Sequence, residues 1–271
     1  MAGNAVARTT EQCELGEGVR WDARRDELLR VDILSGRIYR DKIIDDGGLL
    51  PVETYHVAGT VAAIAPIQGD EGWLLAAARG FSYLRPDGTV RPVAEVAPEG
   101  TRMNDAACDP QGRFWAGTLA HDQRAGGGSL YRLDNTGQTE LIMSGLTISN
   151  GLGWSPDGSL FYSIDTTPGL VYVRDRGGER RVLLDLDVSP DGMCVDAAGN
   201  LWIAVYGAGE VRRYTPSGEL TGVVSVPEPE ATCPAFVGPG LDRLLITTRP
   251  RLFLADVGAV GLPVTPWAGF D

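Results

Sequence analysis

The chain has 271 residues, of which 43% are hydrophobic, so it can bury a sizeable core and is not a disordered segment. Its formal charge of −12 argues against a nucleic-acid partner, because phosphate binding needs a basic face, and we interpret most of that charge as serving solubility. No apolar run approaches the roughly 18 residues that a membrane-spanning helix needs.

The first ten residues lack the basic and apolar regions of a secretory signal peptide. The four cysteines, Cys13, Cys108, Cys194 and Cys233, show neither a close pair nor a zinc-type spacing, which indicates buried reduced thiols. We therefore expect a cytoplasmic protein whose partners include neither nucleic acid nor membrane. The sequence leaves the oligomeric state open.

Short apolar segments that end at a polar turn recur along the chain. Six such segments align on the turn, the second more weakly than the rest: residues 19–21, 61–64, 106–108, 152–154, 193–195 and 235–237. After each comes an apolar strand, and then a strand with an aromatic residue. These aromatic residues are 44, 48, 41, 42 and 39 positions apart: Tyr39, Tyr83, Tyr131, Tyr172, Tyr214 and Phe253.

A repeat of roughly 40 to 50 residues with four short strands is typical of a propeller blade. The 36 glycines and 17 prolines favour many turns, and no long stripe of period 3.6 indicates stacked helices. We predict an all-β, six-bladed β-propeller of four-stranded blades that forms a single domain over residues 1–271.

The ends of the chain suggest how this ring closes. The sixth copy stops short near Phe270, and an N-terminal arm precedes the first copy. We expect a strand from about Ala5 to Glu11 to complete the last blade, because closure hides sheet edges that an open array would expose.

The third repeat contains a polar, glycine-rich insertion at residues 120–128, which lengthens its period to 48. Such loops are mobile and carry function when a rigid scaffold positions them. Two interpretations stand side by side: a loop that overhangs the mouth of a site, or a tolerated surface insertion.

One residue lies five places before each turn, which gives the series Glu17, Thr60, Asn104, Asn150, Asp191 and Cys233. In a propeller these positions enter the innermost strands, so we expect them to line one mouth of the central tunnel. Four of them carry carboxylate or amide oxygens. They could simply be solvated polar residues, but two carboxylates near one axis would repel each other and lose solvation, and a bound cation removes that cost.

The ligand types available in this series indicate the kind of metal. Oxygen ligands without a histidine or cysteine cluster favour a hard divalent ion such as Ca²⁺, Mg²⁺ or Mn²⁺. Zn²⁺ could also bind, although nothing in the sequence selects it.

Five motifs resemble, in the same order, those of the senescence marker protein 30/gluconolactonase/luciferin-regenerating enzyme family. They are Leu15–Trp21, Arg102–Asp105, Phe114–Thr118, Ile148–Leu152 and Pro190–Cys194, which together extend over most of the chain. The resemblance implies a six-bladed propeller with one catalytic divalent metal.

The resemblance also implies roles for individual residues. Glu17, Asn150 and Asp191 match the metal ligands, and Asp191 matches the proposed general base. Arg102 and Asn104 match positions that contact substrate, together with an acidic residue of the third-blade insertion.

The insertion departs from the commonest form of the family, because it offers Asp122 beside His121 where a glutamate is expected. The pocket could therefore suit a different substrate. His121 could equally be a surface histidine, and we expect the other histidine, His56, to be structural.

These expectations lead to a hypothesis of metal-dependent hydrolysis of a sugar (aldono-)lactone. The lactone carbonyl would be polarised by the metal, Arg102 and Asn104 would orient the substrate, and Asp191 would accept the proton of the attacking water. Asp191 could instead serve as a ligand only. No Gly-x-Ser-x-Gly nucleophile motif occurs. A metal-dependent organophosphate or aryl-ester hydrolase, and a non-enzymatic propeller with a structural ion, are the alternatives.

Overall fold

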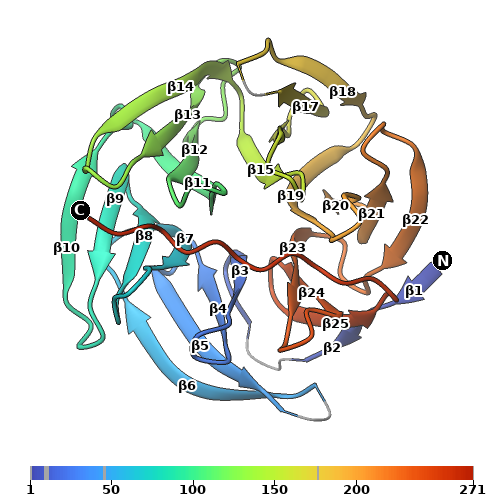
Figure 1. The fold of residues 1–271 in the computed structure, drawn as a ribbon, viewed down its shortest axis with the longest axis horizontal. Helices are drawn as coiled ribbons and strands as arrows, with labels where there is room; N and C mark the ends of the chain where they lie inside the picture. Colours follow the sequence, from blue (N-terminus) through green and yellow to red (C-terminus); the bar gives the residue numbers. More distant parts are fainter. Residues whose placement is uncertain (1, 9–11, 45–46, 176, 271) are drawn as a thin grey trace.

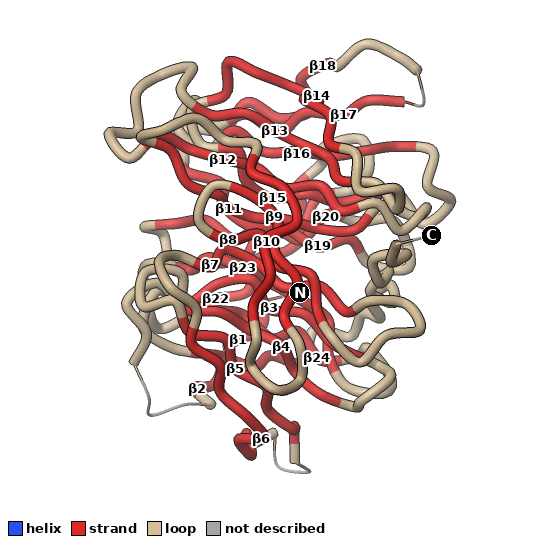
Figure 2. The backbone as a smooth tube through the Cα atoms, turned by 90° about the vertical axis from the view of Figure 1, so that its left-hand side faces the viewer, coloured by secondary structure: helices blue, strands red, loops and turns tan. Residues whose placement is uncertain are grey.

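The computed structural model describes residues 2–8, 12–44, 47–175 and 177–270. Strands and loops make up this part of the chain, which contains no helix (Figure 2), and so none that could span a membrane. Six sheets, antiparallel apart from the strand β1, stand as blades around a central axis (Figure 1). The predicted six-bladed β-propeller is confirmed.

The first three blades follow one another along the chain, each with its first strand innermost. Blade 1 consists of β3 (Gly16–Asp22), β4 (Glu27–Asp32), β5 (Arg37–Ile43) and β6 (Leu49–His56). Blade 2 consists of β7 (Val61–Pro66), β8 (Trp73–Ala77), β9 (Gly80–Leu84) and β10 (Val90–Glu95). Blade 3 consists of β11 (Thr101–Cys108), β12 (Phe114–Ala120), β13 (Gly128–Leu133) and β14 (Thr139–Leu146).

The last three blades complete the ring and include both strands of the N-terminal arm. Blade 4 consists of β15 (Ser149–Trp154), β16 (Leu160–Asp165), β17 (Leu170–Asp175) and β18 (Arg181–Asp185). Blade 5 consists of β19 (Ser189–Val195), β20 (Leu201–Tyr206), β21 (Glu210–Tyr214), β22 (Leu220–Ser225) and β1 (Ala2–Asn4). Blade 6 consists of β23 (Ala231–Val237), β24 (Arg243–Thr248), β25 (Leu252–Asp256) and β2 (Val6–Ala7).

The N-terminal arm closes the ring as predicted. Val6 of β2 pairs antiparallel with Leu254 of β25, so β2 is the outer strand of blade 6. Residues 9–11, also expected in this strand, lie outside the described residues. The arm does more than was predicted, since Ala2 of β1 pairs in parallel with Val223 of β22. It therefore covers the outer edges of two neighbouring blades.

The C-terminal residues 257–270, here called the strap, do not extend blade 6. They leave β25 and cross in front of the ring toward blades 2 and 3 (Figure 1). Backbone N–H groups of the strap donate to a strand end and to two turns: Trp267 to Pro66, the last residue of β7, and Gly261 to Leu241 and Ala268 to Gly112, each at 2.8 Å. The side chain of Trp267 is 1% exposed, so the strap is anchored in the core.

A cavity of about 290 Å³ lies between the strap and the inner strands, lined by strap residues such as Leu262 and by Cys108 and Cys194. All four cysteines are free, which confirms the prediction of reduced thiols. The prediction that they are buried holds only for Cys233, because Cys13, Cys108 and Cys194 are partly exposed.

The inner and outer strands of a blade differ in sequence because they differ in burial. Every residue of β7 and of β8 is buried, since neighbouring blades cover both faces of an inner strand. Such strands are continuous apolar runs, as in any sheet that is covered on both faces. The outer strand β6 is mostly exposed, and His56 lies exposed at its end.

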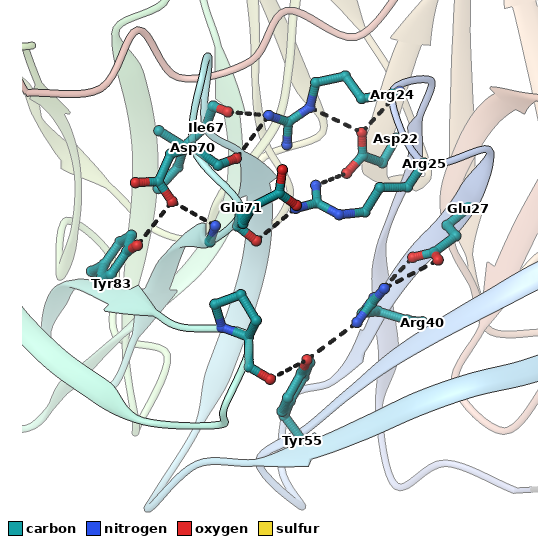
Figure 3. A network of polar contacts seen from close by, with 12 residues as sticks. Asp22, Arg24, Arg25, Glu27, Arg40, Tyr55, Ile67, Asp70, Glu71 and Tyr83 are labelled. Carbon is teal, nitrogen blue, oxygen red and sulfur yellow. Dashed lines mark hydrogen bonds and ion pairs between the residues drawn. The ribbon is translucent and has the colours of Figure 1, made fainter.

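Polar contacts fasten blade 1 to blade 2 (Figure 3). Arg24 Nη1 donates to the backbone oxygen of Asp70 at 2.9 Å, and Arg25 pairs with Glu71 at 2.8 Å and with Asp22 at 2.8 Å. The carboxylate of Asp22 is almost fully buried, so these arginines balance its charge as well as linking the two blades.

Candidate active site

The innermost strand of every blade loses its register with the next strand near the position that the repeat had aligned. The shifts fall between Glu17/Arg20, Val61/Ala63, Met103/Ala106, Asn150/Leu152, Pro190/Met193 and Ala231/Cys233. A β-bulge kinks a strand and turns its side chains in a new direction. The bulges therefore explain how side chains from several blades converge at the axis.

Asn150 and Asp191 meet at the boundary between blades 4 and 5. Asn150 Nδ2 donates to Asp191 Oδ1 and also to Thr166 Oγ1, the latter at 3.1 Å. Gly151 makes this approach possible, because a Cβ added there would lie 2.7 Å from the backbone oxygen of Asp191. Asn150 Oδ1 is buried and has no hydrogen-bond partner among the described residues.

Glu17 lies close enough to Asp191 for the charges of the two carboxylates to interact. Burial raises the pKa of Glu17 well above its usual value, and the charges of Asp191 and Asp105 raise it further. The Glu17 carboxylate accepts one hydrogen bond from Gly18 N, at 2.9 Å. Burial and the charge of Asp105 likewise raise the pKa of Asp191 to about 8, against the hydrogen bond from Asn150. Without a cation these carboxylates are poorly stabilised as anions.

Arg102 and Asn104 lie together on β11 beside this cluster. Arg102 Nη1 donates to Asn104 Oδ1 at 3.0 Å and to the backbone oxygen of Met103 at 2.9 Å. Burial lowers the pKa of Arg102, while the charges of Glu17 and Asp191 raise it. Asn104 Nδ2 donates in turn to the backbone oxygen of Ser149, at 3.0 Å.

His121 and Asp122 lie in the loop between β12 and β13, at the end of the blade where β11 begins. Both residues are exposed, and Asp122 Oδ1 accepts a hydrogen bond from Arg124 Nη1 at 3.0 Å. Within the described part of the chain, no hydrogen bond or ion pair joins their side chains to Glu17, Asn150 or Asp191. Both interpretations of this loop therefore remain.

Two site residues were not predicted, namely Arg20 and Asp105. Arg20 Nη2 donates to Asp105 Oδ1 at 3.2 Å, from blade 1 to blade 3, and Nη1 lies 3.5 Å from Cys233 Sγ. Asp105 is 3% exposed, its Oδ2 has no described partner, and burial raises its pKa. The signal that the sequence offered for Asp105 was its position directly after Asn104. The neighbouring residues do not indicate that the bulge turns both side chains inward.

The donor atoms fit a hard cation. No group of three or more His, Cys, Asp or Glu side chains within residues 2–8, 12–44, 47–175 and 177–270 could hold a metal ion. The candidate set instead combines two carboxylates, Glu17 and Asp191, with an amide oxygen, Asn150 Oδ1, that is buried without a partner. Carboxylate and amide oxygens are the ligands that Ca²⁺ and similar ions prefer.

Comparisons with known proteins find relatives that match this chain over most of its length. The family model described as the SMP-30/Gluconolactonase/LRE-like region matches residues 15–249. Pentonolactonase XacC of Haloferax volcanii is 36% identical over 282 residues, which cover 93% of this chain and 94% of that protein. The L-arabinolactonase of Azospirillum brasilense is 35% identical over 270 residues, which cover 94% of this chain and 87% of that protein.

A similar solved structure is that of regucalcin of Agrobacterium tumefaciens str. C58, described as a calcium-binding protein. It has a TM-score of 0.91 and 25% sequence identity, over 98% of this chain and 99% of that one. The shared architecture thus extends beyond the matched motifs to nearly the whole ring.

Proposed function

Because this chain belongs to the SMP-30/Gluconolactonase/LRE-like family, we propose that it is a metal-dependent lactonase that hydrolyses a sugar (aldono-)lactone. The observation that carries the proposal is the convergence of Glu17, Asn150 and Asp191 from the inner strands of three blades, beside Arg102. The names of two relatives, a pentonolactonase and an L-arabinolactonase, support this substrate class.

We propose that Glu17, Asn150 and Asp191 hold one divalent ion. Ca²⁺ is our first choice, and the calcium-binding description of the related regucalcin supports it; Zn²⁺, Mg²⁺ and Mn²⁺ are alternatives. Such an ion supplies, when bound, a positive charge that polarises a carbonyl oxygen. The buried Asn150 Oδ1, which has no hydrogen-bond partner among the described residues, is the amide atom that would serve as a ligand.

Arg102 and Asn104 orient the substrate in this proposal. The described hydrogen bonds of Arg102 use only Nη1, which leaves Nε and Nη2 to donate to hydroxyl groups or the ring oxygen of the lactone. Because Asn104 is held by Arg102 and by the backbone of Ser149, the pair presents a fixed polar surface. Fixed orientation lowers the entropic cost of reaching the transition state.

Asp191 is the candidate general base. Its Oδ1 accepts the hydrogen bond from Asn150, so Oδ2 is the atom that would take the proton of the attacking water. That proton can then pass to the ring oxygen as the ester bond breaks, which yields the open-chain acid. A carboxylate that also ligates a cation is a weakened base, and the Asp191→Asn variant described below separates the two roles.

The loop between β12 and β13 is the candidate determinant of substrate choice. His121 and Asp122 are exposed at the end of blade 3 that carries Asn104, and the ion pair between Asp122 and Arg124 holds the carboxylate within the loop. An incoming sugar could replace Arg124 as its partner. An exposed ion pair contributes little stability, so the exchange costs little.

The experiment that tests the proposal is a panel of sugar lactones assayed by proton release after chelation and reloading with each divalent ion. We expect hydrolysis only in the reloaded protein. If the protein hydrolyses aryl esters or organophosphates but no lactone, its substrates belong to one of those classes and the proposed lactone substrate is wrong. No hydrolysis at all, with a cation still bound, would leave a propeller with a structural ion.

A further inference from the structure

A second set of polar and aromatic residues recurs on the second and third strands of the blades and in the turn that precedes the second strand. In blade 5, Trp202 Nε1 donates to Asp196 Oδ2 at 3.0 Å, and Arg213 pairs with the same oxygen at 3.3 Å. The guanidinium of Arg213 lies 5.2 Å from the Trp202 ring centre. Asp196, Trp202 and Arg213 thus form a trio, in which the aspartate accepts a hydrogen bond from the indole and the arginine lies near the indole ring.

Blade 3 contains the same trio with a different use of its aspartate. Trp115 Nε1 donates to Asp109 Oδ2 at 2.9 Å, and Arg132 lies 5.5 Å from the Trp115 ring centre. In this blade the aspartate is paired with Arg113, whose Nε donates to Asp109 Oδ2 at 2.6 Å. The arginine near the ring, Arg132, pairs with Glu140 instead. Arg213 in blade 5, and Arg113 and Arg132 in blade 3, therefore each have a carboxylate partner.

Blade 4 keeps the arginine of the trio and loses the aspartate. Ser155 occupies the aspartate position, Phe161 replaces the indole, and Arg174 pairs across the strands with Phe161 as Arg213 does with Trp202. The guanidinium of Arg174 lies 5.9 Å from the Trp115 ring centre and 5.6 Å from that of Phe161. Among the described residues it makes no ion pair.

Arg174 borders a cavity of about 210 Å³ between blades 3 and 4. The side chains of Trp115, Trp154 and Phe161 form an aromatic wall, with ring centres 4.9 to 5.8 Å apart. Arg113 and Arg132 also line the cavity, as does one carboxylate, that of Asp175. Arg113 and Arg132 are paired with Asp109 and Glu140, so Arg174 is the lining arginine without an ion pair among the described residues.

We propose that this cavity binds a small aromatic carboxylate. Its carboxylate would give Arg174 the ion-pair partner that this residue lacks, through two parallel N–H donors. Its ring would pack against Trp154 and Phe161, because offset or edge contacts between rings are favourable. The volume is below the roughly 300 to 1,000 Å³ of pockets for drug-sized ligands, which fits a molecule with one ring.

This site is independent of the proposed lactonase function. The residues that line it include none of Glu17, Arg102, Asn104, Asn150 and Asp191. Occupation of the cavity should therefore be measurable whether or not the protein hydrolyses lactones.

The test measures benzoate binding to the intact protein by calorimetry and by the change in tryptophan fluorescence. We expect saturable binding that Arg174→Gln weakens by about tenfold or more, since a charge-assisted pair is lost. The matched control is Arg91→Gln, which removes an exposed arginine of blade 2 and should leave binding unchanged. Thermal melting of each variant establishes that it is folded.

A second variant tests the argument from the repeat. Ser155→Asp restores the aspartate of blades 3 and 5, so Arg174 gains an internal partner and benzoate should bind more weakly although the arginine is intact. Equal affinity for gluconate and benzoate would overturn the aromatic part of the proposal. Absence of saturable benzoate binding to the unmodified protein, or undiminished binding to folded Arg174→Gln, would overturn it entirely.

Discussion

Asn150 on β15 donates its Nδ2 hydrogen to Oδ1 of Asp191 on β19, and this hydrogen bond joins the bulges of two neighbouring blades. Asp191 Oδ1 is thereby fixed while Oδ2 is left for other partners. Because both side chains are buried, the bond also sets where a ligand or a proton can be held. The strap lies at the other end of the inner strands, where it forms hydrogen bonds with Pro66, Gly112 and Leu241.

Asp191→Asn separates ligation from proton transfer. An amide keeps one oxygen for a cation but cannot accept a proton, so we expect a loss of about 10² to 10⁴ in kcat if Asp191 is the base. Metal content and lactone turnover should be measured on the same sample. Near-full metal content with lost turnover supports the base, whereas retained turnover would leave Asp191 as a ligand only.

The stability of the metal-free protein should fall as pH rises from about 5 to 8. The folded-state pKa of Asp191 is about 8, compared with an ordinary value of 3.8, so between these values the folded state holds a proton that the unfolded state has released. Stability from this group is therefore complete below the lower value and is lost as pH rises through the upper one. The raised pKa of Glu17 acts in the same direction.

Thermal midpoints at several pH values check this prediction. Asp191→Asn should flatten the decline, while the control Asp157→Asn should not, because the pKa of Asp157 is about 2 and lies outside the window. A divalent ion binds the deprotonated carboxylates, so it should raise the midpoint more at pH 8 than at pH 5. A flat or rising profile in the metal-free protein would contradict the argument.

Arg102→Met should lower kcat/KM for lactones by about 10²-fold, because a positioned donor to the substrate is lost. Its positive charge also faces Glu17 and Asp191. Removal of that charge should leave cation affinity unchanged or make it tighter, since like charges repel. Lactone kinetics and calorimetric metal titration on the same variant would show whether kcat/KM falls while cation affinity is kept. A loss of metal binding as well would instead indicate structural damage.

Trp267→Ala should destabilise the fold without changing the chemistry. The side chain is 1% exposed, so its removal leaves a cavity and should lower the free energy of unfolding by about 3 to 5 kcal/mol. The matched control is Val260→Ala in the same strap, which is 51% exposed and should change it by about 0.5 kcal/mol or less. Urea unfolding measures both, and kcat of the folded Trp267→Ala variant should equal that of the unmodified protein.

The sequence by itself determined the six-bladed ring, because each repeat carries its own strands and turns and the period can be counted. It also placed Glu17, Asn150 and Asp191 in one aligned series, since a ring brings equivalent positions of successive repeats to the same end of the axis. The same logic predicted that the N-terminal arm closes the last blade, which β2 does.

Only the tertiary structure decided the features that do not repeat. The ion pair between Arg20 and Asp105 joins residues 85 positions apart across the axis, and the strap contacts turns of blades far from it in sequence. Bulge geometry, which decides where buried side chains point, left no local signal around Asp105. These features depend on contacts between parts of the closed ring that are far apart in sequence. The repeated pattern, by contrast, reflects only the strands and turns that each blade needs in order to fold.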